Sequence, residues 1–316
     1  MTKNIIVHHN DLDGCVSAAM LVKQILQRKD EIYTLVPVMY LGNKDHHKKM
    51  LDDLIMSHLN EPKDRVEHKI FVLDFPWHPM ADIWIDHHRT NALNVPESKR
   101  KYLLTQLDSA AEAVAVYLTD TDKSYTESVN TTWALSWVGR IDSAKYSSAI
   151  EYYNCDNPWL ILRLLTDYDK QAHRTARIAE LLAHNDMDAQ RVVDIIGGTK
   201  KIVDKFQSDI RSTEPAIVVS GSVGLIITRH RNDFPRFAEY ICRPDIKFSI
   251  RVTNLDGGRE IRVGKNPWHP KNDIDIGAIM AEICPNNGGG HPGVGGAIVE
   301  EDEYQGVIDR ILERIS

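Results

Sequence analysis

The stretch Ile83-Trp84-Ile85-Asp86-His87-His88 is an apolar run that ends in a carboxylate and two imidazoles. The same arrangement occurs twice more. Residues 5–7 are apolar and precede His9-Asn10-Asp11-Leu12-Asp13-Gly14, and the apolar run 70–73 ends at Asp74. Short apolar runs of this kind are typical of buried strands. Because ligands collect at the carboxyl edge of an open parallel sheet, we expect the three polar endings to form one site.

The residue types at these strand ends indicate a metal site. Carboxylate and imidazole together suit hard or borderline divalent ions such as Mn²⁺ or Mg²⁺. A carboxylate that bridges two ions about 3.5–4 Å apart is usual where water is activated against a phosphorus centre. A single Asp after a strand is more often a turn residue. Several converging strand ends with His make that explanation improbable for the whole set, and we interpret the set as a two-metal phosphoesterase site.

Composition limits the class of protein. The chain has 316 residues, enough for two domains, with 42% hydrophobic and 26% charged residues. The net charge of −7 argues against a protein coated by nucleic acid over its whole surface. No apolar run approaches the ~20 residues of a membrane span, so we expect no membrane partner.

Cysteine usage and the first residues suggest the compartment. The four cysteines are far apart and form no CxxC pair, which favours reduced thiols over disulfides or a thiolate zinc site. Met1–Asn4 leads directly into a predicted strand, without the apolar region of a signal peptide. We therefore expect a cytoplasmic protein.

The order of predicted elements indicates an α/β fold. In the first half we expect strands at 4–9, 33–40, 70–73 and 82–85, and helices at 15–28, 43–59, 109–119, 124–147, 157–167 and 170–184. Alternating strands and helices imply a mainly parallel sheet with right-handed crossovers. A longer helix over 186–212 is broken at Gly197-Gly198, and we expect a domain junction there.

After residue 212 the pattern becomes rich in strands. We expect one hairpin from 216–220 and 223–228, a second from 246–254 and 259–265, a helix at 274–284 and a terminal amphipathic helix. The predicted organisation is a catalytic domain over 1–190, a helical linker over 191–212 and a smaller α/β substrate-binding domain over 213–316.

The ordered motifs resemble those of one family. They are His9-x-Asp11-x-Asp13-Gly14, then Asp74 at a strand end, then Asp86-His87-His88, a helical Asp142, and Gly288-Gly289-Gly290-His291. This sequence of motifs resembles the DHH phosphoesterase superfamily with its C-terminal DHH-associated substrate domain, in the oligoribonuclease-like phosphodiesterase branch. The resemblance spans nearly the whole chain and is far more specific than any single motif.

The resemblance implies a role for each matching residue. One metal would be held by His9, Asp11 and Asp74, and the second by Asp13, Asp74, His87 and Asp142, with Asp74 as the bridge. His88 would contact the substrate, and Asp86 would orient an imidazole. Two Mn²⁺ ions per chain are expected, with Mg²⁺ or Co²⁺ as alternatives. Without the resemblance, Asp142 would be interpreted as an ordinary acid on a helix surface.

The second half is expected to bind the substrate. Glycines let backbone N–H groups approach an anion, so Gly288, Gly289, Gly290 and His291 are candidate contacts, together with Arg251, Arg262 and Lys265 on the predicted hairpin. The family's usual Ser and Arg on this strand do not align with Gly264-Lys265-Asn266, and Gly295-Gly296 replace the usual alanines.

Charge in the same region bears on substrate length. Residues 226–271 hold ten Lys or Arg and five Asp or Glu. Within an acidic protein, such a segment would attract a few phosphates and repel a long polyanion. A solvated pair of surface strands would give the same tally.

The predicted activity is metal-dependent hydrolysis of short oligonucleotides, or of linear or cyclic dinucleotides, to mononucleotides. Partners would thus be short RNA or DNA. Two alternatives remain open: an exopolyphosphatase- or phosphatase-like hydrolase of the same superfamily, and a non-catalytic nucleotide sensor. A processive single-strand exonuclease would need further domains. RNA or DNA preference, cleavage polarity and oligomeric state, including a homodimer, stay open.

Overall fold

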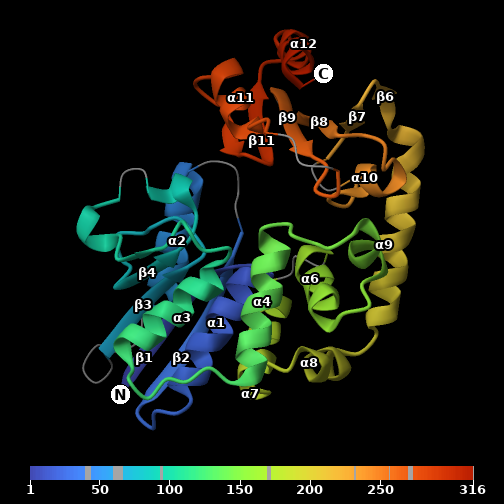
Figure 1. Cartoon of the computed structure of the whole chain (residues 1–316). Helices are drawn as coiled ribbons and strands as arrows, with labels where there is room; N and C mark the ends of the chain where they lie inside the picture. The colour runs from blue at the N-terminus through green and yellow to red at the C-terminus, as the bar shows by residue number, and fades with distance from the viewer. Residues whose placement is uncertain are drawn as a thin grey trace. The chain divides into compact units, whose positions relative to one another are not determined.

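The computed structural model divides the chain into two compact units (Figure 1). The first comprises residues 1–145 and 155–202, and the second comprises 146–154 and 203–316. The structure describes residues 1–39, 44–59, 67–92, 95–168, 172–230, 233–255, 257–269 and 273–315. Three residues that were predicted as element ends, Tyr40, Asn43 and Lys170, fall outside these ranges. Three charged residues of the segment 226–271, namely Arg231, Asp256 and Lys271, also fall outside them.

The first unit is built on a five-stranded sheet in the order β2-β1-β3-β4-β5, in which all neighbours are parallel. The strands are β1 (Thr2–His9), β2 (Glu31–Val38), β3 (Glu67–Leu73), β4 (Ile83–Asp86) and β5 (Tyr102–Leu103). His8 pairs with Leu73, and Leu73 pairs with Ile85. The residues that follow these pairs are His9, Asp74 and Asp86, and they therefore lie level at one edge. The predicted mainly parallel α/β fold is confirmed.

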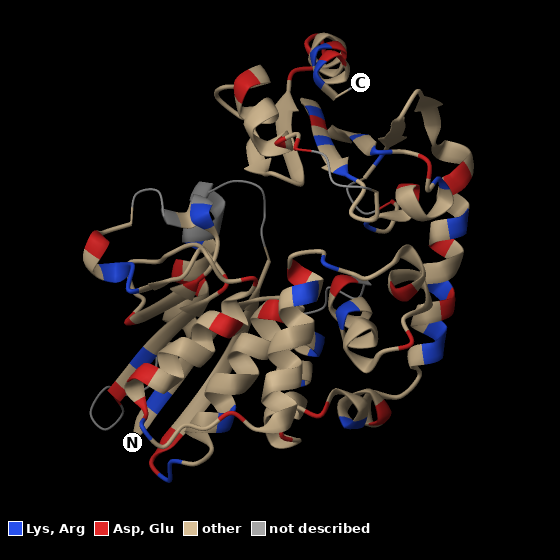
Figure 2. Ribbon diagram, viewed as in Figure 1, with Lys and Arg blue, Asp and Glu red and all other residues tan. Residues whose placement is uncertain are grey.

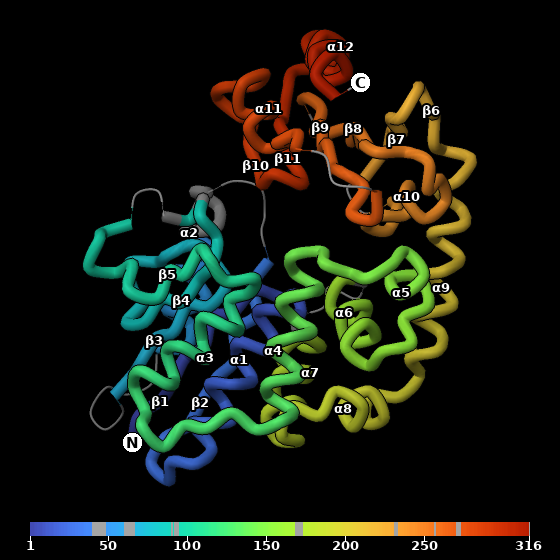
Figure 3. Tube along the Cα trace, in the orientation of Figure 1, coloured from blue at the N-terminus to red at the C-terminus, as the bar shows by residue number. Residues whose placement is uncertain are grey.

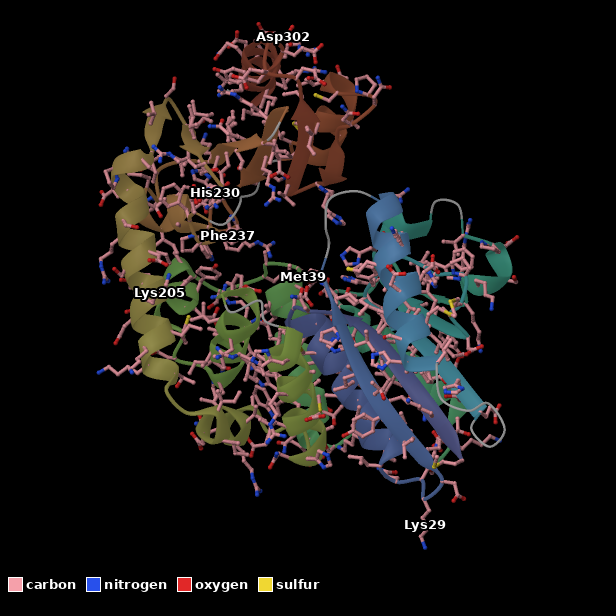
Figure 4. The ribbon with its side chains drawn as sticks, turned by 180° about the vertical axis from the view of Figure 1, so that it is seen from behind. Lys29, Met39, Lys205, His230, Phe237 and Asp302 are labelled. Atoms are coloured by element: carbon pink, nitrogen blue, oxygen red, sulfur yellow. The ribbon has the colours of Figure 1, made fainter. Side chains whose placement is uncertain are left out.

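Helices cover both faces of this sheet. Ile5 and Val7 pack with Leu51 and Ile55 of α2 (Lys44–Leu59) in one apolar cluster. On the other face, α1 (Leu12–Ile25) contacts α3 (Ala110–Thr121) and α7 (Ala172–His184). The remaining elements of this unit are η1 (Arg89–Ala92), η2 (Glu97–Lys99), α4 (Val129–Asp142), α6 (Pro158–Tyr168) and α8 (Ala189–Ile196). The sheet is thus buried on both sides, and its carboxyl edge is where polar side chains gather; Met39 in Figure 4 marks the end of β2 at this edge.

The second unit contains a six-stranded sheet in the order β10-β11-β9-β8-β7-β6. Its strands are β6 (Val218–Ser220), β7 (Val223–Thr228), β8 (Phe248–Leu255), β9 (Gly258–Lys265), β10 (Gly289–His291) and β11 (Val294–Val299). Both predicted hairpins are present, and β7 and β8 pair in parallel. Of the predicted contact residues Gly288, Gly289, Gly290 and His291, the last three form β10, which the sequence did not indicate as a strand.

One face of the second sheet is covered by α11 (Ile276–Ile283) and α12 (Tyr304–Ile315), which share its apolar core. The unit also contains α5 (Ala149–Asn154), η3 (Glu214–Ala216) and α10 (Ala238–Cys242). Most of the charged residues of strands β8 and β9 lie on β9, which carries Arg259, Glu260, Arg262 and Lys265, whereas β8 carries Arg251 (Figure 2).

The predicted helix break is present at Gly197 and Gly198, whose φ angles are 64° and 63°. It separates α8 from α9 (Thr199–Thr213), and the boundary between the units falls within α9, after Ile202 (Figure 3). The domain bounds 1–190, 191–212 and 213–316 stay a proposal, because compact units need not coincide with folding domains. Among the helices that the structure describes, none has both the length and the apolar character needed to cross a membrane.

Candidate metal centre

The turn after β1 places three of the predicted ligands. Asp11 is the N-cap of α1, and its Oδ1 accepts a hydrogen bond from the Gly14 N–H at 2.9 Å. A Cβ at Gly14 would lie 2.0 Å from the His9 carbonyl oxygen, so this position requires glycine. The helix therefore starts directly against the strand end, and His9, Asp11 and Asp13 are held around a single turn.

Asp74 lies beside this turn and is almost fully buried. His9 Nδ1 is 2.7 Å from Asp11 Oδ2 and 3.5 Å from Asp74 Oδ2. Asp74 has a φ of 52°, a left-handed conformation that Asp adopts more readily than most residues. Its backbone N–H donates to the Ile85 carbonyl at 3.0 Å, which fixes the carboxylate at the end of β3.

Asp13 is held by the first turn of α3. Its two carboxylate oxygens accept hydrogen bonds from the backbone N–H groups of Ala110 at 2.7 Å and Ala111 at 2.8 Å. Ser109 caps this helix by accepting from the Glu112 N–H. The N-terminus of a helix stabilises negative charge, so α3 both orients Asp13 and favours its ionised form.

His87 faces three carboxylates. Its Nε2 lies 3.6 Å from Asp13 Oδ2, 3.7 Å from Asp74 Oδ1 and 3.4 Å from Asp142 Oδ2. Asp142 is the last residue of α4. The other ring nitrogen, Nδ1, is 3.4 Å from the Leu107 carbonyl, an arrangement that places the proton on Nδ1 and leaves Nε2 to face the acids.

His88 is oriented by Asp86, which has no exposed surface. Asp86 Oδ1 accepts from the backbone N–H groups of His87 at 2.8 Å and His88 at 3.1 Å, and lies 2.9 Å from His88 Nδ1. His88 Nδ1 is also 3.5 Å from Asp74 Oδ1. These contacts direct the His88 ring toward the same carboxylates.

The donor set fits divalent cations. Within the described residues, three groups have ligand atoms within 4.8 Å of one another: His9, Asp11 and Asp74; Asp74, His87 and His88; Asp13, His87 and Asp142. Among the residues that the structure describes, Asp74 Oδ1 and His87 Nε2 are buried and find no hydrogen-bond partner. Buried polar atoms are normally satisfied, so these two are explained by ions that they would bind.

Burial and neighbouring charges shift the pKa values of the acids and imidazoles at this centre. Burial, followed by neighbouring carboxylates, raises the pKa of Asp13 and Asp74 well above the ordinary value. Burial also opposes ionisation of Asp11, but the adjacent His9 outweighs it and lowers the Asp11 pKa. Burial disfavours the charged form of His88, yet the hydrogen bond with Asp86 and the charge of Asp74 raise its pKa to about 10.

The predicted substrate residues of the second unit do not form a comparable cluster. Arg251 donates to both oxygens of Glu239 and to the carbonyls of Phe234 and Pro235, and this ion pair is largely buried. Lys265 Nζ donates to the Ile274 carbonyl at 2.6 Å. These contacts give Arg251 and Lys265 roles inside their own unit, and they offer little support for our prediction of substrate binding by either residue.

Compared with Arg251, the predicted contact residues Arg262 and His291 are more exposed. Arg262 is 49% exposed and lies 3.1 Å from Glu260, and His291 is also exposed. A Cβ at Gly289 would meet no atom within 4 Å.

The glycines on either side of Gly289 have packing reasons. Their added Cβ atoms would lie 2.1 Å from the Met280 carbonyl for Gly288 and 2.3 Å from the Val294 carbonyl for Gly290. These distances explain why Gly288 and Gly290 lack a Cβ, and they leave the predicted backbone contacts of the glycines with a substrate as a prediction.

Several residues around the centre were not singled out from the sequence. Asn91 contacts Asp86, the Leu107 carbonyl contacts His87, and the Ala110 and Ala111 N–H groups hold Asp13. The helix predicted over 109–119 starts close to the observed start of α3, and the start of a helix favours a nearby anion. Nothing in the sequence indicates which anion it would be.

Comparison with known proteins supports the fold. No protein-family model matches the sequence, and no curated protein matches it either. A solved structure of the pGpG-specific phosphodiesterase PggH from Vibrio cholerae has 17% identity and a TM-score of 0.62, over 99% of this chain and 98% of that one.

RecJ from Thermus thermophilus, in complex with Mn²⁺, has 12% identity and a TM-score of 0.48, over 98% of this chain and 51% of RecJ. PggH and RecJ are members of the DHH superfamily. With its ordered motifs and its likeness to PggH over nearly the whole length, the chain has the fold of the DHH phosphoesterases.

Proposed function

We propose that the protein is a metal-dependent phosphodiesterase that hydrolyses short oligonucleotides or dinucleotides to mononucleotides. The observation that carries this proposal is the position of Asp74. Its Oδ2 lies 3.5 Å from His9 Nδ1, and its Oδ1 lies 3.5 Å from His88 and 3.7 Å from His87. One carboxylate thus faces two ligand groups, as a bridge between two ions must.

The ligands would be shared as the motifs suggest. His9 and Asp11 would complete one ion site with Asp74, and Asp13, His87 and Asp142 would complete the other. Donors of this type suit Mn²⁺, with Mg²⁺ or Co²⁺ as substitutes. When bound, such a pair of ions would activate water and neutralise charge on the phosphoryl oxygens.

The residues of the chain contribute orientation and charge. Asp86 holds Nδ1 of His88, so that Nε2 is the nitrogen that would contact a phosphoryl or leaving oxygen. The α3 N-terminus holds Asp13, and the Leu107 carbonyl holds His87, so neither ligand needs to reorganise when an ion binds.

For the substrate, we propose a short nucleotide with few phosphates. PggH, with the same fold over almost its whole length, is described as specific for pGpG, which supports a dinucleotide-sized substrate here. Arg262, Gly289 and His291 are the proposed contacts in the second unit. We propose a cytoplasmic location, and the choice of RNA or DNA, the polarity and the oligomeric state stay open.

A length series tests the proposal. The full chain with Mn²⁺ should cleave 5′-phosphorylated RNAs most efficiently at two nucleotides, with catalytic efficiency falling steeply toward about ten nucleotides at fixed salt. Equal or rising efficiency toward long single strands would favour a processive exonuclease instead. Release of phosphate from polyphosphate alone would indicate an exopolyphosphatase, and dinucleotide binding without hydrolysis would indicate a sensor.

A further inference from the structure

Asn91 lies in the 3-10 turn η1 that follows His88, and its side chain reaches back to Asp86. Asn91 Nδ2 donates to Asp86 Oδ2 at 2.6 Å. The backbone N–H of Asn91 donates to the His88 carbonyl at 3.1 Å. These two bonds fold the turn over the Asp86 carboxylate.

The Asp86 carboxylate is fully buried, and its two oxygens have different partners. Oδ1 accepts from His87 and His88, including the His88 ring. Within the described part of the chain, Oδ2 accepts its hydrogen bond from Asn91. A buried carboxylate oxygen that loses its donor carries a substantial desolvation cost. Without Asn91, the carboxylate would therefore rotate to share the donors of Oδ1, and the hydrogen bond to the His88 ring would weaken.

We propose that Asn91 is a positioning residue for hydrolysis, which acts by fixing Asp86 and, through Asp86, the orientation and tautomer of His88. This inference rests on the proposed function for its catalytic consequence. The link runs through two hydrogen bonds, Asn91 to Asp86 and Asp86 to His88, and contains none of the residues that the proposed function assigns as metal ligands. Loss of Asn91 should therefore affect turnover and leave metal content unchanged.

The first experiment compares Asn91→Ala, Asn91→Asp and Asn91→Gln in the full chain, with Mn²⁺ and a 5′-phosphorylated diadenylate. Loss of a residue that supports a site residue typically lowers activity ~10–100-fold, and we expect this loss in kcat for Asn91→Ala, with unchanged KM and Mn²⁺ content. Asn91→Asp keeps the shape but replaces the donor by a like charge, so it should lose at least as much. Asn91→Gln keeps the donor and should recover part of the activity.

The control is Asn185→Ala, which removes an amide hydrogen bond to the Leu181 carbonyl in the same unit, away from the centre. It should retain wild-type kcat. Wild-type turnover in Asn91→Asp would overturn the proposal, because that variant fills the same space without donating.

A double-mutant cycle tests the route through His88. In a His88→Ala background, Asn91→Ala should change kcat by less than about threefold, because the ring that Asn91 positions is absent. Losses of equal factor in both backgrounds would show that Asn91 acts elsewhere and would overturn the inference.

A readout independent of activity separates this inference from the proposed function. In ¹⁵N-labelled protein with Mg²⁺, the His88 Nδ1–H resonance, identified by its loss in His88→Ala, should disappear or broaden in Asn91→Ala. If the wild type cleaves no dinucleotide but the resonance depends on Asn91, the proposed function fails and the positioning stands. An unchanged resonance in Asn91→Ala overturns the positioning.

Discussion

Charged residues are arranged differently in the two units. At the carboxyl edge of the first sheet, Asp13, Asp74 and Asp142 face the same imidazole, and two of these acids have strongly raised pKa values. On β8 of the second sheet, Arg251 is paired with Glu239 and capped by backbone carbonyls. The first arrangement is incomplete without added cations, whereas the second is complete within its own unit. A cluster of acids without enough neighbouring positive charge is therefore a better indication of a metal site than an ion pair whose charges already balance.

The largest effect is expected at the residue that both ligand groups share. Asp74→Ala should abolish hydrolysis and release metal while the fold persists, since the side chain lies at a strand end and not in the apolar core. Metal analysis of the purified variant and its activity on diadenylate check this. Metal-replete, active wild type that contained a single ion per chain would contradict the binuclear centre.

The two adjacent histidines should separate binding from turnover. His88→Ala should lower kcat by ~10²–10⁴ while metal content stays normal, because His88 is expected to act on the substrate. His87→Ala should lose metal, because its Nε2 faces three acids. Similar metal loss in both variants would refute the division of roles.

The paired and exposed arginines of the second unit should give opposite results. Arg251→Ala leaves Glu239 buried without its partner and should lower the free energy of unfolding by about 3–5 kcal/mol. Arg262→Ala removes a half-exposed pair with Glu260, so stability should change by less than about 1 kcal/mol. Chemical denaturation measures both changes.

For substrate binding we expect the larger effect at Arg262, which is exposed, and not at Arg251, which is paired within its own unit. Arg262→Ala should raise KM for diadenylate more than for bis-p-nitrophenyl phosphate, which is too small to reach beyond the metal centre. The double variant Arg251→Met, Glu239→Leu should recover stability, since it removes both buried charges together. If Arg262→Ala leaves the KM for diadenylate unchanged, its proposed contact with the substrate is wrong.

The positions of the polar residues at the strand ends were predictable for a simple physical reason. Apolar runs reveal where buried strands end, and parallel pairing brings those ends level, so His9, Asp74 and Asp86 follow from pattern alone. Asp142 did not follow in this way. It is the last residue of a helix, where an acid resembles a surface residue, and only the order of the family's motifs pointed to it.

Other side-chain contacts could not be predicted from the sequence because they depend on how the elements pack. Arg251 was expected to bind substrate, but its partner Glu239 lies on α10, and strand periodicity does not tell which part of a sheet face another element covers. Asn91 reaches Asp86 through a turn that carries no distinctive composition. Most of the elements were thus predicted from the sequence, whereas the contacts of Arg251 and Asn91 within the fold were not, and substrate binding by the second unit stays a prediction.

The smallest expected effect concerns pH and again separates the two units. Asp13 and Asp74 have raised pKa values in the folded, metal-free protein, mainly through burial and then through neighbouring acids. Folded molecules therefore hold protons that unfolded chains have released, and stability is lost as the pH rises from about 4 through the raised values. His88 contributes in the same direction: because the folded state favours its protonated form, with a pKa of about 10, this stability is lost as the pH rises from 6.5 to about 10.

Cations bind the deprotonated ligands and relieve the same repulsion, so the gain in melting temperature on adding Mn²⁺ should be larger at pH 8 than at pH 6. Thermal denaturation at both pH values, with and without Mn²⁺, measures this gain. In Asp74→Ala the gain in melting temperature and its pH dependence should largely vanish. In Arg262→Ala both should match the wild type, because Arg262 lies on the second sheet and is not one of the proposed metal ligands. If the gain in melting temperature became smaller as the pH rises, the cation would not be displacing protons from the buried acids of the first sheet.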